Sequence, residues 1–421
     1  MSIYLTFLFY AIPSFSVLIF IEMIAARVKG LEINRSSDMI SSLSSGLTNT
    51  IKDAIKFGVV LISYSSMVDS MTVYKLEPMW LAILIAFIVQ DFSGYWMHRL
   101  NHRVNIFWNR HIIHHSSEEF NLSCGLRQSI STTFKFSAIL FIPAAILGIP
   151  AHIFAILGPI HLFMQFWYHT QLIGKMGILE HIIVTPSHHR VHHAINSIYL
   201  DRNYGQILII WDKLFGSFQV ELGDEKPVYG TLRPVKTWNP IIINYKHLYQ
   251  LIKDAWRAER FIDKIRIWFM PTGWRPEDVN SKHPLEQIKV PSAQIKYDTK
   301  TSISLSAWSW IQYVLTVVMM LHMFTVVEDI APVMGYMYAL FLFIHIFSVT
   351  SLLDGKKYSM VAELSKLGLA AFLLYNQQYS WYGISGILII LLSAYLIGSL
   401  VITCFFLNRN QKKINIGRYG I

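Results

Sequence analysis

The sequence predicts an all-α protein, a helical bundle that crosses a membrane several times. Hydrophobic residues make up 53% of its 421 residues and charged residues only 15%, whereas soluble domains are about 25% charged. Apolar runs of about 20 residues, the length that spans a bilayer as a helix, recur along the chain. The composition therefore excludes a disordered chain and argues against an ordinary soluble globule.

The apolar runs form two groups on either side of a polar stretch. In the first group, the run at 134–168 is long enough for two spans, and its prolines predict a helical hairpin that turns near Pro150. The polar stretch at 169–302 contains no run of membrane length. We expect about eight spans in all. The other expected spans lie at 3–26, 57–68, 79–97, 305–326, 333–352, 360–374 and 384–407.

The basic residues predict the orientation of these spans. Cytoplasmic loops are enriched in lysine and arginine, and a cytoplasmic loop after the first span places every strongly basic connection on that same side. These connections are 27–35, 99–135, 169–302, 356–357 and the tail with Lys412 and Lys413. The turns on the opposite side carry one lysine, Lys75. The net charge of +10 therefore fits loops beside an anionic leaflet better than binding to nucleic acid.

The histidines are clustered at the ends of spans that this orientation places in the cytoplasm. Three clusters have the spacings H-x-x-x-H, H-x-x-H-H and H-x-x-H-H. Residues three or four apart share a face of a helix, so each cluster can present two or three imidazoles in one direction. A further candidate, His169, lies where the expected hairpin meets the polar stretch. The clusters are His98 and His102, then His111, His114 and His115, then His189, His192 and His193.

This pattern predicts a centre that holds two metal ions. Imidazole suits zinc, copper, iron and nickel, and the two cysteines, Cys124 and Cys404, exclude a cysteine-based zinc site. One tetrahedral ion cannot use so many histidines. The motifs H-E-x-x-H and G-x-x-x-x-G-K-[ST] are absent, so neither a metalloprotease nor a nucleotide-binding loop is indicated. The isolated histidines, which we expect to be anchors, are His152, His247, His283, His322 and His345.

Several polar residues near the clusters are candidates for orienting the metal ligands. Asp91 and Glu118 could accept hydrogen bonds from ring N–H groups, although surface carboxylates would explain them as well. His188 lies beside the third cluster. For Arg127 and Arg190 we expect a general role at the membrane surface. The segment at 245–262 predicts an amphipathic helix at the membrane interface, with a solvated helix as the alternative.

The clusters and their surroundings resemble the fatty acid hydroxylase / sterol desaturase superfamily of membrane di-iron oxygenases, and within it the alkylglycerol monooxygenase (glyceryl-ether monooxygenase) family. The resemblance is strong over about residues 80–220 and weaker in the apolar C-terminal region. The runs that carry it are His98–His102, Trp108–Asn121, Leu126–Ser129, Gln165–Thr170, Thr185–His193, Asn203–Gly205 and Ile210–Gly216.

The resemblance implies that the three clusters and His169 ligate two iron ions. His169 matches the second histidine of an extra H-x-x-x-H box found in some members, and Gln165 stands where the first would be. His188 is additional to the family pattern. The resemblance also implies O₂-dependent hydroxylation of the carbon beside the ether oxygen of an alkylglycerol, which yields a fatty aldehyde and glycerol. Electrons would come from outside the chain, with tetrahydrobiopterin as the implied donor.

The hydropathy pattern and the resemblance together predict four parts of the chain. We expect N-terminal transmembrane helices at 1–78, a fatty acid hydroxylase-like catalytic domain at 79–220, a cytoplasmic cap with an amphipathic segment at 221–302, and C-terminal transmembrane helices at 303–421.

Three other functions remain open at this point. A different lipid hydroxylase or desaturase of the same superfamily, acting on a sterol or a fatty acyl chain, would share the iron chemistry. A metal transporter would need polar ligands along a path near the middle of the membrane, whereas the clusters lie at one face. A structural zinc-binding membrane scaffold would use the same ligands without turnover.

Overall fold

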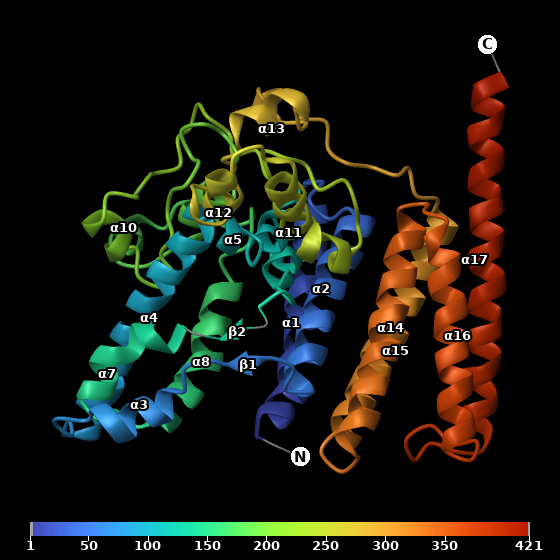
Figure 1. The fold of residues 1–421 in the computed structure, drawn as a ribbon, viewed down its shortest axis with the longest axis horizontal. Coiled ribbons are helices and arrows are strands. Elements are labelled where there is room, and N and C mark those ends of the chain that lie inside the picture. The colour runs from blue at the N-terminus through green and yellow to red at the C-terminus, as the bar shows by residue number, and fades with distance from the viewer. Residues whose placement is uncertain (1–2, 133, 136, 420–421) are drawn as a thin grey trace.

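The computed structural model describes residues 3–132, 134–135 and 137–419. Long apolar helices stand side by side, and a polar cap of short helices and loops covers one end of them (Figure 1). The chain enters at the end away from the cap, and the carboxyl end of the last helix lies on the side of the cap (Figure 1). This arrangement places the polar connections of the chain together at one end of the bundle.

The N-terminal half of the bundle is built around two long apolar helices, α1 (Ile3–Val28) and α4 (Met79–Arg103). Beside them lie α2 (Ser36–Ala54) and α8 (Ala151–Phe166), where Pro150 precedes the first turn of α8. The smaller elements are α3 (Tyr64–Met71), η2 (Ser137–Phe141), α7 (Ile142–Ile146), and the short parallel pair of β1 (Val59–Val60) and β2 (Phe134–Lys135).

The C-terminal half is a bundle of four helices whose apolar core contains a buried ion pair. They are α14 (Ile303–Val326), α15 (Pro332–Leu353), α16 (Tyr358–Asn376) and α17 (Ile387–Tyr419). On α16, Lys366 is fully buried, and its Nζ lies 2.8 Å from Glu363 Oε2. Ser348 of α15 and Ser399 of α17 donate hydrogen bonds to the same carboxylate. Each charge is thus paired where water is excluded.

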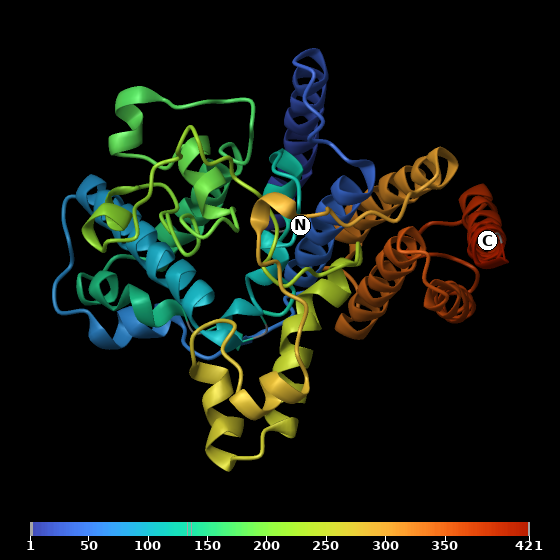
Figure 2. The same cartoon turned by 90° about the horizontal axis from the view of Figure 1, so that it is seen from above.

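The cap lies over the carboxyl ends of α4 and α8 (Figures 1 and 2). Its largest elements, α11 (Pro240–Arg257) and α12 (Phe261–Phe269), form a pair that projects sideways from the bundle (Figure 2). Its other elements are α5 (Asn105–Trp108), α6 (Ile112–His115), η1 (Leu122–Leu126), η3 (Gly177–His181), α9 (Pro186–His192), α10 (Ile210–Leu214), α13 (Glu277–Lys282) and η4 (Pro291–Ala293).

The structure confirms a mostly helical membrane protein but corrects several expected spans. Among the described residues, five helices are long and apolar enough to cross a membrane, namely α1, α4, α14, α15 and α17. The run at 57–68 is not a span, because it forms β1 and the start of the eight-residue α3. The run at 134–168 folds into η2, α7 and α8, which are shorter than a span. The side chains of Lys412 and Lys413 lie outside the described residues.

The helix α2 was not predicted, because its serines interrupt any apolar run, yet it supports the cap. Arg127 is 1% exposed, and its Nη2 lies 3.0 Å from Asp38 Oδ2 on α2. The same guanidinium donates to Ser42 at 2.8 Å and to Ser116 at 2.6 Å. The expected surface role of Arg127 is therefore wrong. Arg190, which is also buried, is paired with Glu221 rather than lying at the surface.

We expect Asp38→Ala to destabilise the protein by about 3–5 kcal/mol, because it leaves the Arg127 guanidinium buried without its counter-charge. The matched control is Glu259→Ala, which breaks an exposed pair with Lys282 and costs about 1 kcal/mol or less. Thermal unfolding of the detergent-solubilised chain measures both. Equal midpoints for the two variants would contradict the structural role assigned to this pair.

Candidate metal centre

Four segments of chain bring the predicted histidines together beneath the cap. His98 and His102 lie one turn apart near the carboxyl end of α4. His111 precedes α6, which carries His114 and His115. The list is completed by His169, three residues after the end of α8, by His189 and His192 on α9, and by His193, which directly follows that helix.

The structure gathers these histidines into two adjacent groups in which the ligand nitrogens lie within 4.8 Å of one another. Every histidine that the sequence predicts as a metal ligand belongs to one group, and no cysteine or carboxylate of the described residues joins either group. The first group is His98, His102, His111, His115 and His192, and the second is His114, His169, His189 and His193. The two groups have the ligand chemistry of two metal sites.

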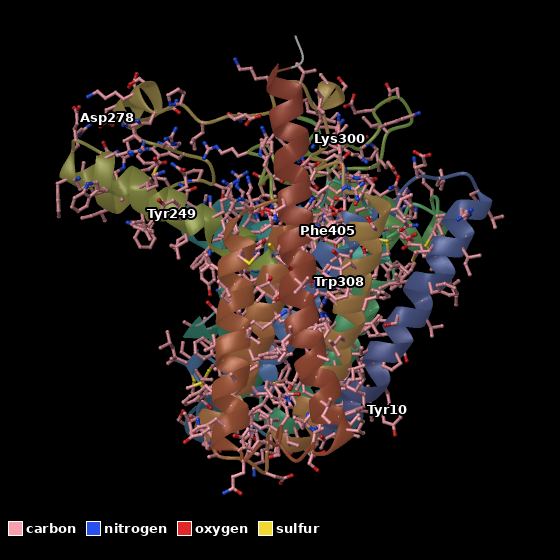
Figure 3. All side chains as sticks on the ribbon, turned by 90° about the vertical axis from the view of Figure 1, so that its right-hand side faces the viewer. Tyr10, Tyr249, Asp278, Lys300, Trp308 and Phe405 are labelled. Atoms are coloured by element: carbon pink, nitrogen blue, oxygen red, sulfur yellow. The ribbon has the colours of Figure 1, made fainter. Side chains whose placement is uncertain are left out.

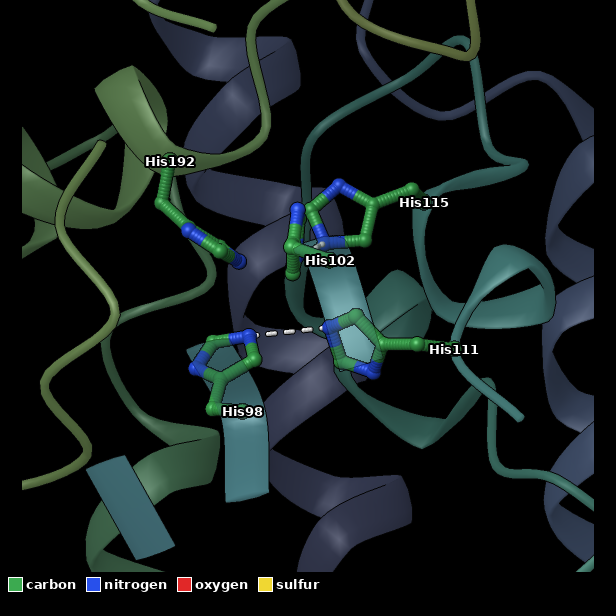
Figure 4. Close-up of side chains that lie close together, drawn as sticks. All are labelled: His98, His102, His111, His115 and His192. Atoms are coloured by element: carbon green, nitrogen blue, oxygen red, sulfur yellow. Dashed lines mark hydrogen bonds between the residues drawn. The ribbon is translucent and has the colours of Figure 1, made fainter. Parts of the chain in front are cut away.

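The first group turns its rings toward a common point between α4, α6 and α9 (Figure 4). The Nε2 atoms of His98 and His111 are 2.9 Å apart, and those of His102 and His115 are 3.1 Å apart. His192 completes the group from the opposite side, and its buried Nε2 has no hydrogen-bond partner among the described residues. A buried ring nitrogen without a partner is costly unless something else binds it.

The ring nitrogens of the second group are also close together. His189 Nε2 lies 2.8 Å from His169 Nε2 and 3.0 Å from His193 Nε2. His114 Nε2 lies 3.0 Å from His193 Nε2 and 3.3 Å from His169 Nε2. Four Nε2 atoms therefore converge, and each of them is close to at least two others.

Backbone carbonyls determine which nitrogen of several rings carries the proton. A carbonyl oxygen can only accept a hydrogen bond, so a ring nitrogen that faces one must carry the proton. In a neutral imidazole, the other ring nitrogen then has no proton and carries a free lone pair. His114 Nδ1 faces Arg127 O, and His169 Nδ1 faces Gln165 O. The same holds for His98 at Tyr204 O and for His192 at Arg202 O.

This protonation pattern fits a bound cation. In the neutral rings, the Nε2 atoms of His114 and His169 both carry lone pairs and no proton. They lie only 3.3 Å apart, a distance at which their lone pairs repel. A metal ion between them removes the repulsion and provides the partner that His192 Nε2 lacks. The donor set, all imidazole, suits iron or zinc and does not suit calcium or magnesium.

Burial keeps the rings outside the spans neutral, which is the form that binds metal. The pKa values of His111, His114 and His115 are held well below the ordinary value, first by burial and then by repulsion from neighbouring imidazoles. The pKa values of His189, His192 and His193 are lowered for the same two reasons. For His169, burial lowers the pKa to about 4.

Aromatic side chains close the centre off from water. Phe120 is fully buried, and its ring centroid lies 5.3 Å from that of His193. Tyr168 is buried on the other side, with its ring 4.3 Å from that of His189. Gly125 lets the chain pass close to the site, because a Cβ there would lie 2.9 Å from His169 Nδ1.

The candidates for orienting the ligands lie near the centre, but most of them do not contact the nine histidines. Asp91 accepts hydrogen bonds from His161, from Trp211 and from the backbone N–H groups of Ile207 and Leu208. It therefore holds the loop that presents Tyr204 O rather than a ligand itself. Glu118 accepts from the backbone N–H of Tyr297 and lies near Arg35 instead of a ligand, because it joins the cap to the N-terminal helices.

The other two candidates differ from each other. Gln165 contacts His169 through its backbone carbonyl, while its side-chain amide reaches His161. His188 caps the start of α9 by accepting a hydrogen bond from the backbone N–H of Thr185. Its ring belongs to neither group.

The groups that orient the rings are mostly backbone carbonyls, which the sequence could not reveal. Tyr204 O, Arg127 O and Arg202 O have this role whatever side chain they carry. One side chain was also missed. Asp201 Oδ1 lies 3.5 Å from His102 Nδ1, and no spacing in the sequence relates these two residues.

Comparison with known proteins places this centre in a family. The fatty acid hydroxylase family model matches residues 83–217, which contain all nine histidines. The alkylglycerol monooxygenase of Homo sapiens is 33% identical over 356 residues, covering 84% of this chain and 79% of the relative. The alkylglycerol monooxygenases of Xenopus tropicalis and Danio rerio are 35% and 38% identical, covering 74% and 63% of this chain and 69% and 59% of their own lengths.

No solved structure matches the fold. The family model and the relatives support a lipid-modifying oxidoreductase. The identity of about one third extends well beyond the histidine clusters and over most of both chains. This chain therefore belongs to the alkylglycerol monooxygenase family, and it carries a fatty acid hydroxylase domain.

Proposed function

We propose that the chain is a membrane-bound di-iron monooxygenase that opens the ether bond of alkylglycerols. The observation that carries this proposal is the convergence of imidazole lone pairs in two adjacent buried groups. The relatives that cover most of the chain are named alkylglycerol monooxygenase, which supports the choice of substrate. Hydroxylation of the carbon beside the ether oxygen would give a hemiacetal, which breaks down to fatty aldehyde and glycerol.

The residues of the chain would hold two irons and keep water away from them. The first group, with five imidazoles, would bind one ion, and the second group, with four, would bind the other. The bound irons would supply the oxidising power for O₂-dependent attack on a C–H bond, which amino-acid side chains lack. Backbone carbonyls hold the rings in the tautomer that points Nε2 inward. Phe120 and Tyr168 exclude water from the second group.

The position of the centre suits a substrate with long tails. His98 and His102 lie at the cap end of a candidate span, α4, so the centre adjoins the membrane surface. An ether lipid could keep its alkyl chain in the bilayer while its reactive carbon reaches the metals. We infer from the basic loops that this surface is cytoplasmic. We also propose that residues 79–220 form the catalytic domain, between transmembrane parts at 1–78 and 303–421 and with a cap at 221–302.

Electrons for O₂ reduction must come from a donor outside the chain, and we propose tetrahydrobiopterin. With O₂, ferrous iron and this pterin, membranes containing the chain should release fatty aldehyde from an alkylglycerol. Omission of any one of the three should stop the release, which mass spectrometry of the products measures. Turnover of a sterol or fatty acyl lipid, with the glyceryl ether left intact, would instead identify a different lipid hydroxylase or desaturase.

We expect His114→Ala to abolish turnover and to lower the iron content of the purified chain, because His114 contacts two other rings of the second group. The matched control is His283→Ala, an exposed histidine in the cap, which should keep both iron and activity. Metal analysis by plasma mass spectrometry provides a readout that does not depend on turnover. Full iron content in the His114 variant would remove it from the ligands.

Removal of the metals should destabilise the fold. Without a cation, the facing lone pairs of His114 and His169 repel, so an iron chelator should lower the thermal unfolding midpoint and ferrous iron should restore it. Tryptophan fluorescence of the solubilised chain measures the midpoint. A midpoint that is the same with and without chelator, in a sample shown to have lost its metal, would contradict the proposed role of the ions.

A further inference from the structure

The helix pair α11 and α12 exposes a large apolar surface on the side away from the metal centre. The buried face of α11 carries Ile243, which packs with Ile112 and Ile113 beside the histidines. On the opposite face, Trp256 is 85% exposed. A contiguous exposed patch of large apolar side chains is typical of an interaction site. The exposed large side chains are Tyr245, Tyr249, Ile252 and Trp256 on α11, and Phe261, Ile262, Ile265 and Phe269 on α12.

This surface lies at the level where the apolar helices end. In Figure 3, α11 runs sideways from the bundle, and Tyr249 lies below Lys300 and Asp278 and nearly level with Phe405. Phe405 belongs to the candidate span Ile387–Arg409, close to its end on the cap side. A helix at this level with aromatic and basic residues is typical of the headgroup layer of a bilayer.

A cavity of about 480 Å³ adjoins this surface, between α11 and the turn that joins α15 to α16. Because that turn links two apolar helices at the cap end, the cavity also lies at the membrane surface. Aliphatic and aromatic groups form much of its wall. Its polar residues are Lys236, Lys246, Lys356, Thr237, Tyr245, Tyr249 and Tyr358.

The cavity carries positive charge that the protein only partly neutralises. Lys236 is paired with Glu286 at 2.6 Å. Lys246 donates only to backbone carbonyls, those of Pro234 and Val235. Lys356 is exposed and has no ion-pair partner among the described residues. Burial, followed by repulsion from Lys236, lowers the pKa of Lys246, and the nearby carboxylates of Glu286 and Asp354 only partly oppose this shift.

We propose that this cavity binds the phosphate of an anionic phospholipid from the surrounding bilayer. Lys246 and Lys356 would contact the phosphate, and the lipid's acyl chains would lie along the apolar surface of α11. A membrane lipid is favoured over a soluble phosphate compound because the cavity is continuous with exposed apolar residues such as Tyr249 and Ile252. The site is separate from the metal centre, since none of the nine histidines lines the cavity.

The test uses the full chain in detergent micelles and follows its thermal unfolding midpoint as lipid is added. We expect dioleoyl phosphatidic acid to raise the midpoint, and phosphatidylcholine, inorganic phosphate and glycerol 3-phosphate to leave it unchanged. Lysine at a membrane surface contributes about 1 kcal/mol to binding an anionic lipid. The Lys246→Gln/Lys356→Gln variant should therefore bind phosphatidic acid about 25-fold more weakly, roughly fivefold for each lysine.

A control with the same loss of charge is Lys282→Gln/Lys289→Gln, at exposed positions of the cap, which should respond to phosphatidic acid as the wild type does. The single variant Lys356→Gln guards against misfolding, since this exposed lysine makes no ion pair with a described residue. An unchanged response in both cavity variants would overturn the proposal. So would an equal response to phosphatidylcholine, while an equal response to glycerol 3-phosphate would assign the cavity to a soluble ligand.

Discussion

The arrangement of this protein depends on one electrostatic problem, which is how to hold many imidazole lone pairs within a few ångströms of one another. Carbonyls at Tyr204, Arg127, Gln165 and Arg202 hold Nδ1 as a donor and so turn Nε2 inward. Burial keeps the rings outside the spans uncharged. The result is a set of rings whose facing lone pairs repel one another, a repulsion that bound cations would relieve.

The rest of the fold keeps that centre in place. Asp91 accepts two hydrogen bonds from the loop before Trp211, one from the Trp211 indole and one from His161 on α8. Asp38 on α2 holds Arg127, whose carbonyl faces His114. Both carboxylates are buried, and neither bonds to any of the nine histidines. The histidines are therefore positioned by buried polar contacts that reach from the first helices of the chain to the cap.

The sequence was most informative for features that show as a regular residue spacing or as an apolar run of membrane-spanning length. Helical spacing of His98 and His102, and the repeated H-x-x-H-H pattern, were enough to select eight of the nine histidines that converge, and His169 was selected by its position and by the family resemblance. The long apolar runs at 305–326 and 333–352 correspond closely to α14 and α15. These features are local, since a single helix determines them.

Features that depend on distant partners could not be predicted in this way. The run at 57–68 is apolar, but Val59 and Val60 pair with the distant strand β2, and Tyr64 of α3 packs with residues of α4, α7 and α8. The helix α2 has too many serines to be recognised, and its role rests on Arg127. Glu118 has the composition of a ligand-orienting residue, yet its partners, Arg35 and Tyr297, come from two remote segments.

The ion pair inside the C-terminal bundle has a consequence for how the chain is made. Because α16 carries Glu363 and Lys366, it lacks the composition of a helix that enters lipid unaided. Ser348 of α15 and Ser399 of α17 satisfy these charges. Insertion of α16 into a membrane would therefore be coupled to that of α17, because a chain cut before α17 would lack Ser399, which bonds both charges.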